Sequence, residues 1–247
     1  MRQYQSLLIV AGLAAGLIGC HSDPAPKPSS TFDSPASDAP QDEAIESTPN
    51  TPTADATPSN LAHDPRPLLV CFGDSLTAGF GADPGQSYPD YLQADLDAAG
   101  LHYHVLNSGI SGNTTKDAVE RVNSIVALHP AVVVVEFGGN DGLRGLRIED
   151  SRANLDKVVA TLKASGTKVL LAGITLPPNY GPDYIRQFDA TYSMLAEKYH
   201  VPLLPFLLKG VVGVDGLMQA DRTHATGKGN KVVATNVLPF VLPLLKK

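Results

Sequence analysis

The strongest constraint on the fold is a regular alternation of apolar runs and helical patterns along residues 68–245. The apolar runs are continuous or nearly so, as expected for parallel strands that are covered on both faces. We expect strands at residues 68–72, 104–106, 132–137, 168–174 and 203–206. We expect helices at residues 87–99, 114–128, 149–164, 184–199 and 227–245. This alternation of strand and helix predicts a doubly wound α/β domain.

Residues 1–20 have the composition of an export signal. Arg2 gives a positive start, and residues 7–19 are apolar. This run is shorter than the roughly 20 residues that span a bilayer, so a secretory signal fits better than a transmembrane helix. The run ends in LIGC at Cys20, which resembles the lipobox of bacterial lipoproteins. That resemblance implies removal of the signal and lipidation of Cys20; an ordinary signal peptide with a chance cysteine is the alternative.

Lipidation of Cys20 would place the protein in the bacterial cell envelope. Two or more acyl chains hold a protein stably at a membrane surface without a transmembrane helix. The residue after Cys20 is His21 and not aspartate, which favours the outer membrane or the periplasmic side in Gram-negative lipoproteins. We therefore expect a membrane contact through an N-terminal lipid anchor.

Residues 21–66 are predicted to be a disordered linker between the signal peptide and a domain at residues 67–247. The linker is rich in Pro, Ser, Thr, Ala and Asp, so it cannot bury enough apolar surface to offset its ordering entropy. Its excess of acids over bases equals the formal net charge of the whole chain, −6. The rest of the chain, with Arg2 counted, is therefore neutral, and the domain has no basic stripe, which gives no support for nucleic-acid binding.

Cys71 is the second of the chain's two cysteines and lies in an apolar run. We expect a buried strand residue without a disulfide partner. A thiol nucleophile at this position is the less favoured alternative.

Residues that suit catalysis follow the predicted strands. Ser75 follows the first strand, Gly112 the second and Asn140 the third, and Asp221 and His224 come after the fifth. All of them lie beyond the carboxyl ends of strands, where open α/β sheets place ligands. Their joint placement predicts one site.

Ser75, Asp221 and His224 suit nucleophilic catalysis. A hydroxyl needs a general base to become a nucleophile at neutral pH, and the base works best when a third group fixes its orientation. The spacing lets the Asp221 carboxylate reach His224 Nδ1, which leaves Nε2 for Ser75. An unrelated surface aspartate and histidine are the alternative. Asp74 is better explained as an acceptor that holds its loop than as the acid of this set.

Gly112, Asn140 and the backbone N–H of Ser75 are candidates for an oxyanion hole. Acyl transfer needs donors aimed at the developing negative charge. Glycine allows close approach of the backbone, and an asparagine amide is a neutral donor. For residues 138–142, the alternative to an oxyanion-hole role is a flexible turn after a strand.

Four ordered motifs resemble those of the SGNH (GDSL) hydrolase family, specifically its thioesterase I/lysophospholipase-like and arylesterase branch. They are FGDSLTAG at residues 72–79, NSGISG at 107–112, EFGGNDGLRG at 136–145 and LPPNYG at 176–181. The resemblance implies Ser75 as nucleophile, His224 as base and Asp221 as its orienting acid. It assigns Ser75, Gly112 and Asn140 to the oxyanion hole.

The same resemblance implies a flavodoxin-like three-layer α/β/α sandwich. Its five-stranded parallel sheet should have the order 2-1-3-4-5, and neither a metal nor a cofactor is implied.

The last motif departs from the family pattern. The family usually carries Asp-Gly-Ile-His-Pro or something close, whereas this chain has DRTHA at residues 221–225. The spacing of acid and base is kept, but the turn loses its proline. We expect a less rigid turn in which Arg222 could compete for Asp221.

Apolar residues near the predicted site indicate the substrate. Ile110, Leu143, Leu146, Leu176 and Tyr180 could bind an acyl or aryl group, although some of them could simply belong to the core. We hypothesise a monomer that hydrolyses small-molecule carboxylic esters or thioesters through an acyl-Ser75 intermediate. The alternatives are a carbohydrate O-acetyl esterase and a non-catalytic binding module tethered to a surface.

Overall fold

The computed structural model describes residues 64–245. The predicted signal peptide, Cys20 and nearly all of the predicted linker lie outside the described residues. Lipidation and the domain boundaries therefore stay predictions.

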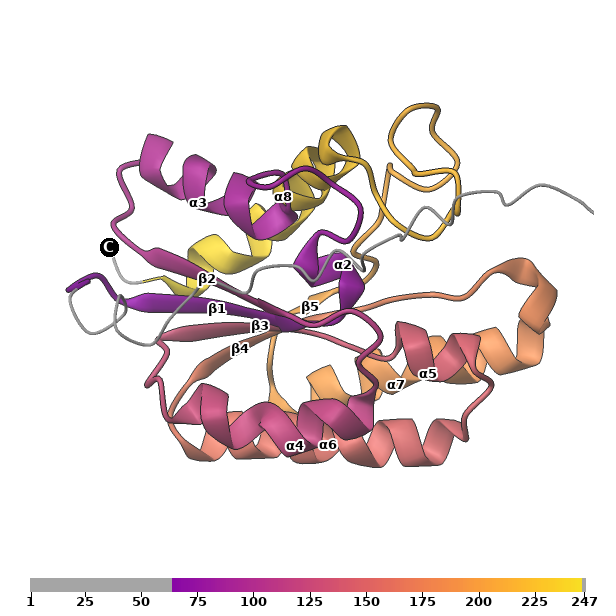
Figure 1. Ribbon diagram of the computed structural model, residues 1–247. Helices are drawn as coiled ribbons and strands as arrows, with labels where there is room; N and C mark the ends of the chain where they lie inside the picture. Colours follow the sequence, from indigo (N-terminus) through magenta and orange to yellow (C-terminus); the bar gives the residue numbers. More distant parts are fainter. Residues whose placement is uncertain (1–63, 246–247) are drawn as a thin grey trace, which may run out of the picture. The chain divides into compact units, whose positions relative to one another are not determined.

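Five parallel strands form a sheet with the order β2-β1-β3-β4-β5 (Figure 1). The strands are β1 (Leu68–Gly73), β2 (His104–Gly109), β3 (Val132–Glu136), β4 (Lys168–Ala172) and β5 (Leu203–Leu204). Every neighbouring pair is parallel. The predicted fold class and strand order are confirmed.

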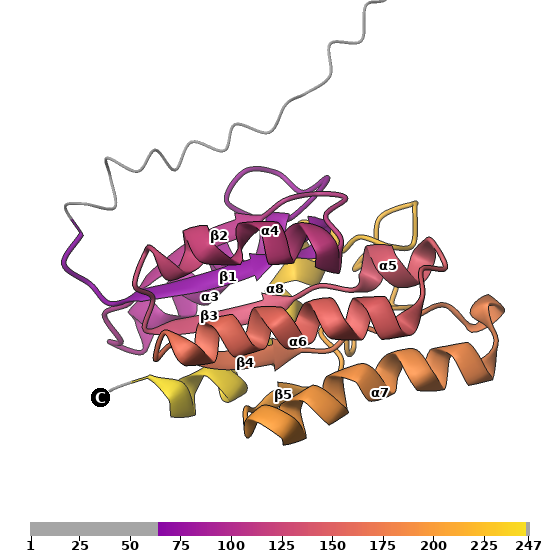
Figure 2. The same cartoon turned by 90° about the horizontal axis from the view of Figure 1, so that it is seen from below.

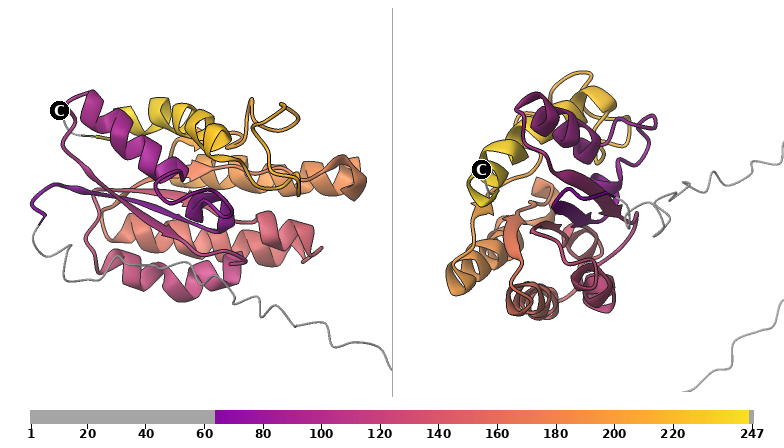
Figure 3. Two further views of the ribbon diagram at one scale, coloured as in Figure 1. Left: turned by 45° about the horizontal axis from the view of Figure 1, so that its top comes forward. Right: turned by 90° about the vertical axis from the view of Figure 1, so that its left-hand side faces the viewer.

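Helices cover both faces of the sheet. The longer helices are α3 (Tyr88–Ala98), α4 (Thr115–Val126), α6 (Ile148–Ala164), α7 (Pro182–Tyr199) and α8 (Gly227–Val241). Helices α3 and α8 lie on one face, and α4, α6 and α7 lie on the other (Figures 1 and 2). Figure 3 shows the sheet between these two layers. Among residues 64–245, no helix has both the length and the apolar composition needed to cross a membrane.

The core lies along the central strands. Residues 69–72 of β1 and 132–135 of β3 are fully buried, including Cys71, which is a free thiol as expected. Each buried Val or Leu side chain contributes about 1.5–3 kcal/mol relative to exposure. Burial also raises the pKa of the Cys71 thiol to about 12, which rules out a thiolate nucleophile at neutral pH.

Element ends differ from the sequence expectation for identifiable reasons. Strand β2 continues to Gly109 although its last residues are polar, because it is an edge strand and only half-buried. Strand β5 stops after Leu204, because the next donor to the Gly173 carbonyl is the N–H of Leu207 and the regular register is lost. Two helices of a single turn were not expected: α2 (Ser75–Ala78) and α5 (Gly139–Leu143). The 3₁₀ turns η1 (Pro178–Tyr180) and η2 (Leu242–Leu244) complete the described elements.

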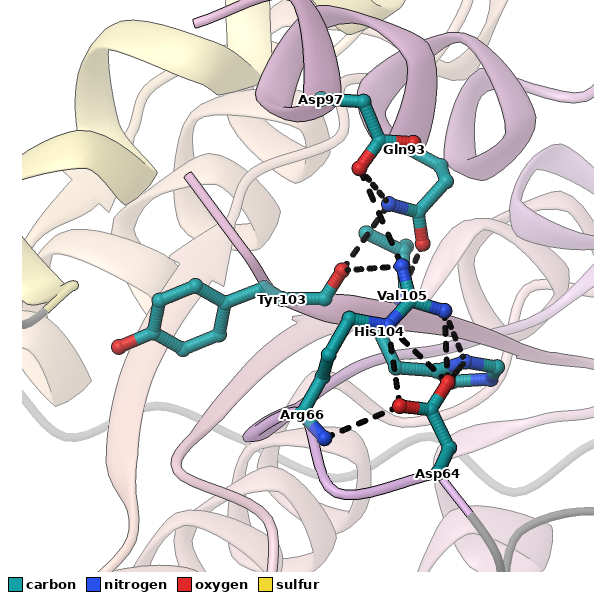
Figure 4. Close-up of polar contacts among 7 residues, drawn as sticks. All are labelled: Asp64, Arg66, Gln93, Asp97, Tyr103, His104 and Val105. Atoms are coloured by element: carbon teal, nitrogen blue, oxygen red, sulfur yellow. Dashed lines mark hydrogen bonds and ion pairs between the residues drawn. The ribbon is translucent and has the colours of Figure 1, made fainter. Parts of the chain in front are cut away.

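The chain enters the domain through a polar cluster at the amino end of β2 (Figure 4). Asp64 accepts hydrogen bonds from Arg66, and its Oδ2 lies 2.9 Å from His104 Nδ1. Arg66 also donates to the Tyr103 carbonyl, to which Gln93 donates as well. Asp64 and Arg66, assigned to the linker from the sequence, are therefore packed against the domain. The cluster lies at the sheet edge opposite to the carboxyl ends of the strands.

Candidate active site

The residues predicted to form the site meet at the carboxyl edge of the sheet. Ser75 opens α2 directly after β1, and Asn140 lies in α5 directly after β3. Gly112 lies in the loop after β2, and Asp221 and His224 lie in the loop that leads to α8. The strand arrows in Figure 1 point to this edge.

A hydrogen-bonded chain links the serine, the histidine and the aspartate. His224 Nε2 is 2.9 Å from Ser75 Oγ, and His224 Nδ1 is 2.7 Å from Asp221 Oδ2. A carboxylate can only accept here, so Nδ1 carries the proton and Nε2 accepts from the Ser75 hydroxyl. This is the arrangement in which an imidazole can take a proton from an attacking hydroxyl.

Backbone donors fix Asp221. Its Oδ1 accepts from the N–H of Thr223 at 2.9 Å and of His224 at 3.0 Å. Burial acts to raise the pKa of Asp221, but the hydrogen bonds from His224 and Thr223 outweigh it and leave the pKa below its usual value. The acid is therefore ionised at neutral pH. No hydrogen bond or ion pair joins it to the Arg222 side chain within the described residues.

Gln219 and Phe80 hold the histidine loop, and no sequence pattern singles out either residue. The Gln219 side-chain amide donates to the carbonyls of Phe80 at 2.6 Å and Ala225 at 2.9 Å. The Gln219 backbone N–H donates to the His224 carbonyl, next to a bridge between Met218 and Ala225. The Phe80 ring packs on the imidazole with centroids 4.7 Å apart. These contacts supply restraint that the missing proline would otherwise give.

Asn140 is held by acceptors on both sides. Its Nδ2 donates to Asp74 Oδ2 at 3.1 Å and to the Asn113 carbonyl at 2.9 Å. Gly112 takes a left-handed backbone conformation, with φ of 82°, and lines the same cavity as Ser75 and Asn140. An oxyanion bound in this cavity would share or replace one of the two acceptors of the Asn140 amide.

A buried pair of carboxyl groups lies behind the serine. Asp74 is 2% exposed and accepts from the Leu76 N–H at 3.0 Å. Glu136 is fully buried, and its Oε2 accepts from the Thr77 hydroxyl at 2.8 Å and the Asp74 N–H at 3.3 Å. Asp74 is therefore a loop-holding acceptor, as expected. The role of Glu136 was not foreseen, because nothing in its motif separates it from a strand residue.

Burial determines the protonation states of these two carboxyl groups. It raises the pKa of Asp74 to about 6 and the pKa of Glu136 well above its usual range. Glu136 therefore keeps its proton at neutral pH, which removes the repulsion that a second carboxylate would exert on Asp74. Gly73 belongs to the same packing, because a Cβ there would clash with the Thr77 hydroxyl.

A second polar contact positions α5. Asp141 is buried and accepts from the N–H and the hydroxyl of Thr115, at 2.9 and 2.5 Å. It also accepts from the Ser151 hydroxyl at 3.0 Å. Asp141 thus joins the starts of α4 and α6 to the turn that carries Asn140.

A cavity of about 810 Å³ opens beside Ser75. Its wall is largely apolar and includes Leu76, Leu143, Ile174, Leu176, Phe206 and Val212. Of the five predicted substrate-binding residues, Leu143 and Leu176 line the cavity, whereas Ile110, Leu146 and Tyr180 do not. Ile110 and Leu146 are exposed, and Tyr180 donates its hydroxyl to the Leu143 carbonyl from outside the wall.

Comparison with known proteins identifies similar chains. The model of the GDSL-like Lipase/Acylhydrolase family matches residues 71–232. The chain is 43% identical over 178 residues to Esterase TesA of Pseudomonas aeruginosa, covering 72% of this chain and 89% of that protein. It is 38% identical over 157 residues to an arylesterase of Vibrio mimicus, covering 63% and 78%. It is 34% identical over 178 residues to Thioesterase 1/protease 1/lysophospholipase L1 of Escherichia coli, covering 72% and 84%.

A solved structure agrees with these sequence matches. The crystal structure of TesA superposes with a TM-score of 0.70 at 42% identity. The match covers 72% of this chain and 99% of that one.

Proposed function

The chain belongs to the GDSL-like lipase/acylhydrolase family and is a carboxylic ester hydrolase, and we propose that it cleaves esters and thioesters of apolar acyl chains through an acyl-Ser75 intermediate. Relatives named esterase, arylesterase and thioesterase support this range of substrates. The apolar wall beside Ser75 supports an acyl chain as the group that is bound.

In the proposed mechanism Ser75 Oγ attacks the substrate carbonyl carbon as His224 Nε2 takes the hydroxyl proton. Asp221 stabilises the imidazolium that forms and holds it in place. Asn140 and the backbone N–H groups of Gly112 and Ser75 would donate to the oxyanion of the tetrahedral intermediate. Collapse of this intermediate breaks the bond to the leaving oxygen or sulfur, which receives the proton from His224.

Hydrolysis of the acyl enzyme repeats these steps with water. His224 takes a proton from water as its oxygen attacks the acyl carbon, and the second tetrahedral intermediate collapses to release the carboxylic acid. The proton on His224 returns to Ser75 Oγ, so the enzyme is regenerated unchanged.

The hydrogen-bonded chain from Ser75 through His224 to Asp221 is the observation that carries this proposal. We would measure hydrolysis of p-nitrophenyl esters from acetyl to palmitoyl by the full chain. Ser75→Ala should abolish turnover and labelling by a fluorophosphonate, whereas Ser193→Ala on the exposed side of α7 should change neither. Absence of turnover by folded wild-type protein across this series would refute the proposal. Faster cleavage of acetylated sugars than of any acyl ester would favour the O-acetyl esterase alternative.

We also propose that the enzyme is a monomer attached to the bacterial envelope through lipid on Cys20. The LIGC motif supports the attachment, and the acidic, proline-rich linker suits a domain displayed away from its anchor. Mass spectrometry of the mature N-terminus should find acyl groups on Cys20, and Cys20→Ser should release the protein from membranes. A free cysteine at a cleaved N-terminus would contradict lipidation. Light scattering of the Cys20→Ser protein tests the monomer.

A further inference from the structure

Arg222 brings a positive charge to the cavity at a position where the family pattern usually has glycine. The residue lines the cavity that also contains Ser75 and His224. Its backbone is left-handed, with φ of 56°, a conformation that is free of strain for glycine and strained for arginine. The chain thus keeps a large cation at a site whose backbone disfavours any side chain.

The charge of Arg222 is not neutralised by its neighbours. The oxygens of Asp221 are occupied by Thr223 and His224, at distances of 2.7 to 3.0 Å. Within residues 64–245, the Arg222 guanidinium makes no hydrogen bond and no ion pair. A guanidinium has five N–H donors in a planar fork that matches a carboxylate or a phosphate, so all of them are available to a ligand.

No other group on the cavity wall offers this charge. Of the residues that line it, Asp74 is the one acid, and it is buried behind Ser75. Arg144 does not line the cavity, and its guanidinium donates to the Gly112 carbonyl at 3.0 Å. Arg222 is therefore the exposed permanent charge of an otherwise largely apolar wall.

The position of Arg222 indicates which half of the substrate it faces. It lies two residues before His224, on the same loop, and His224 passes its proton to the leaving group. The apolar residues Leu143, Ile174 and Leu176 come instead from the segments that follow β3 and β4. An acyl chain along those residues places the alcohol or thiol half of the substrate beside the histidine loop.

We propose that Arg222 is a specificity residue that binds an anionic group, a carboxylate or a phosphate, on the alcohol or thiol half of the substrate. This inference rests on the proposed ester and thioester hydrolysis. It goes beyond that function by naming a charge in the leaving group and the residue that recognises it.

The test compares substrates that differ only in this charge. Full-length protein would be assayed with 4-butyryloxybenzoate and with its neutral methyl ester, and the ratio of the two kcat/KM values calculated. Arg222→Gln and Arg222→Gly should lower the ratio of charged to neutral substrate by about 3- to 10-fold, the range expected for a partly exposed charged contact. Arg222→Lys should retain most of it. Arg186→Gln, an exposed arginine of α7, should leave the ratio unchanged.

Salt and natural leaving groups extend the test. The wild-type ratio should fall as NaCl rises from about 20 mM to about 500 mM, because salt screens exposed charges. Butyryl-coenzyme A paired with neutral butyryl-N-acetylcysteamine tests a nucleotide phosphate. Lysophosphatidate paired with the matching monoacylglycerol tests a lipid phosphate. The pair whose ratio depends most on Arg222 identifies the source of the anion.

The outcomes separate this inference from the proposed function. Turnover of the neutral ester with the same ratio in wild type and Arg222→Gln would overturn the role of Arg222 alone. A ratio in Arg222→Lys that is lower than in Arg222→Gln would also overturn it, because a retained positive charge would then not favour the anionic substrate. Failure of the wild type to hydrolyse either member of each pair would overturn the proposed function as well.

Discussion

Replacing Asp221 by asparagine and by alanine distinguishes two effects of this residue on activity. One is the negative charge beside His224, and the other is control of the His224 tautomer. Asp221 Oδ1 accepts two backbone N–H groups, and Oδ2 accepts His224 Nδ1–H. An asparagine has one oxygen for these three donors. If that oxygen stays with the backbone, its NH₂ faces Nδ1, and the imidazole must then carry its proton on Nε2. Nε2 would donate to Ser75 and could not take its proton.

The competing rotamer of the introduced asparagine is less stable. It would give the oxygen to His224 Nδ1–H and lose the two backbone hydrogen bonds, whereas the first rotamer loses only the bond from Nδ1–H. A net hydrogen bond is worth about 1 kcal/mol, so the inactive tautomer should dominate by roughly 5- to 10-fold. Asp221→Ala imposes no tautomer, because water can reach a site where the aspartate side chain is 40% exposed.

Both variants lose the stabilisation of the imidazolium. At the 2.7 Å separation of Asp221 and His224, exposure keeps this term near its screened limit, about 1.5–3 kcal/mol. We therefore expect kcat to fall roughly 10- to 150-fold in Asp221→Ala. The tautomer penalty should bring Asp221→Asn to about 10²–10³-fold, so the more conservative replacement should be the less active one.

The assay is kcat for p-nitrophenyl butyrate at saturating substrate, with circular dichroism to verify the fold. Asp215→Asn, an exposed acid in the segment before the site, serves as the matched control and should keep wild-type kcat. If the asparagine variant is as active as the alanine variant or more so, the tautomer argument is wrong. If both keep kcat within a few-fold of wild type, Asp221 is not the orienting acid.

Three further predictions concern the groups that hold the site. Asp74→Asn should lower kcat about 10- to 100-fold with little change in KM, because its NH₂ would face the Asn140 amide; steady-state kinetics on a neutral ester will decide. Burial raises the pKa of Asp74 to about 6 from 3.8, so its protonated form stabilises the fold at low pH and this contribution is lost as pH rises through about 6. Urea unfolding between about pH 4 and pH 7 should therefore show a smaller decline in Asp74→Asn than in wild type, and equal declines would exclude Asp74 as the cause. Gln219→Ala should lower kcat about 10-fold, and a further Ala225→Pro change should restore part of it; no recovery would mean that the loop is not what Gln219 holds.

The fold and the placement of the reacting groups were predictable because they follow from local pattern. Apolar runs mark the strands, and parallel connectivity brings every strand end to one edge, so Ser75 and His224 could be placed together across 149 positions of sequence. Strand ends were less predictable where an edge strand is polar, as at Gly109.

The supporting contacts were not predictable, because they join residues that have no local signal. Gln219 reaches Phe80 across 139 positions, and Glu136 reaches Thr77 across 59. Neither glutamine nor glutamate carries a periodic pattern that marks such a role. Loop side-chain direction was equally inaccessible, which is why Ile110 was expected in the cavity wall and lies outside it.

Two of the departures in the last motif, at Arg222 and at Ala225, have a common explanation in the structure. A glycine and a proline shape such a loop through its backbone, the first by permitting a left-handed residue and the second by restricting its neighbour. Here the side chain of Gln219 ties the loop to Phe80 and Ala225, so the loop conformation depends on a tertiary contact. That contact can offset the strain of a left-handed Arg222. A cation could then be accommodated in the loop without displacing Asp221 and His224, whose hydrogen bond is kept at 2.7 Å.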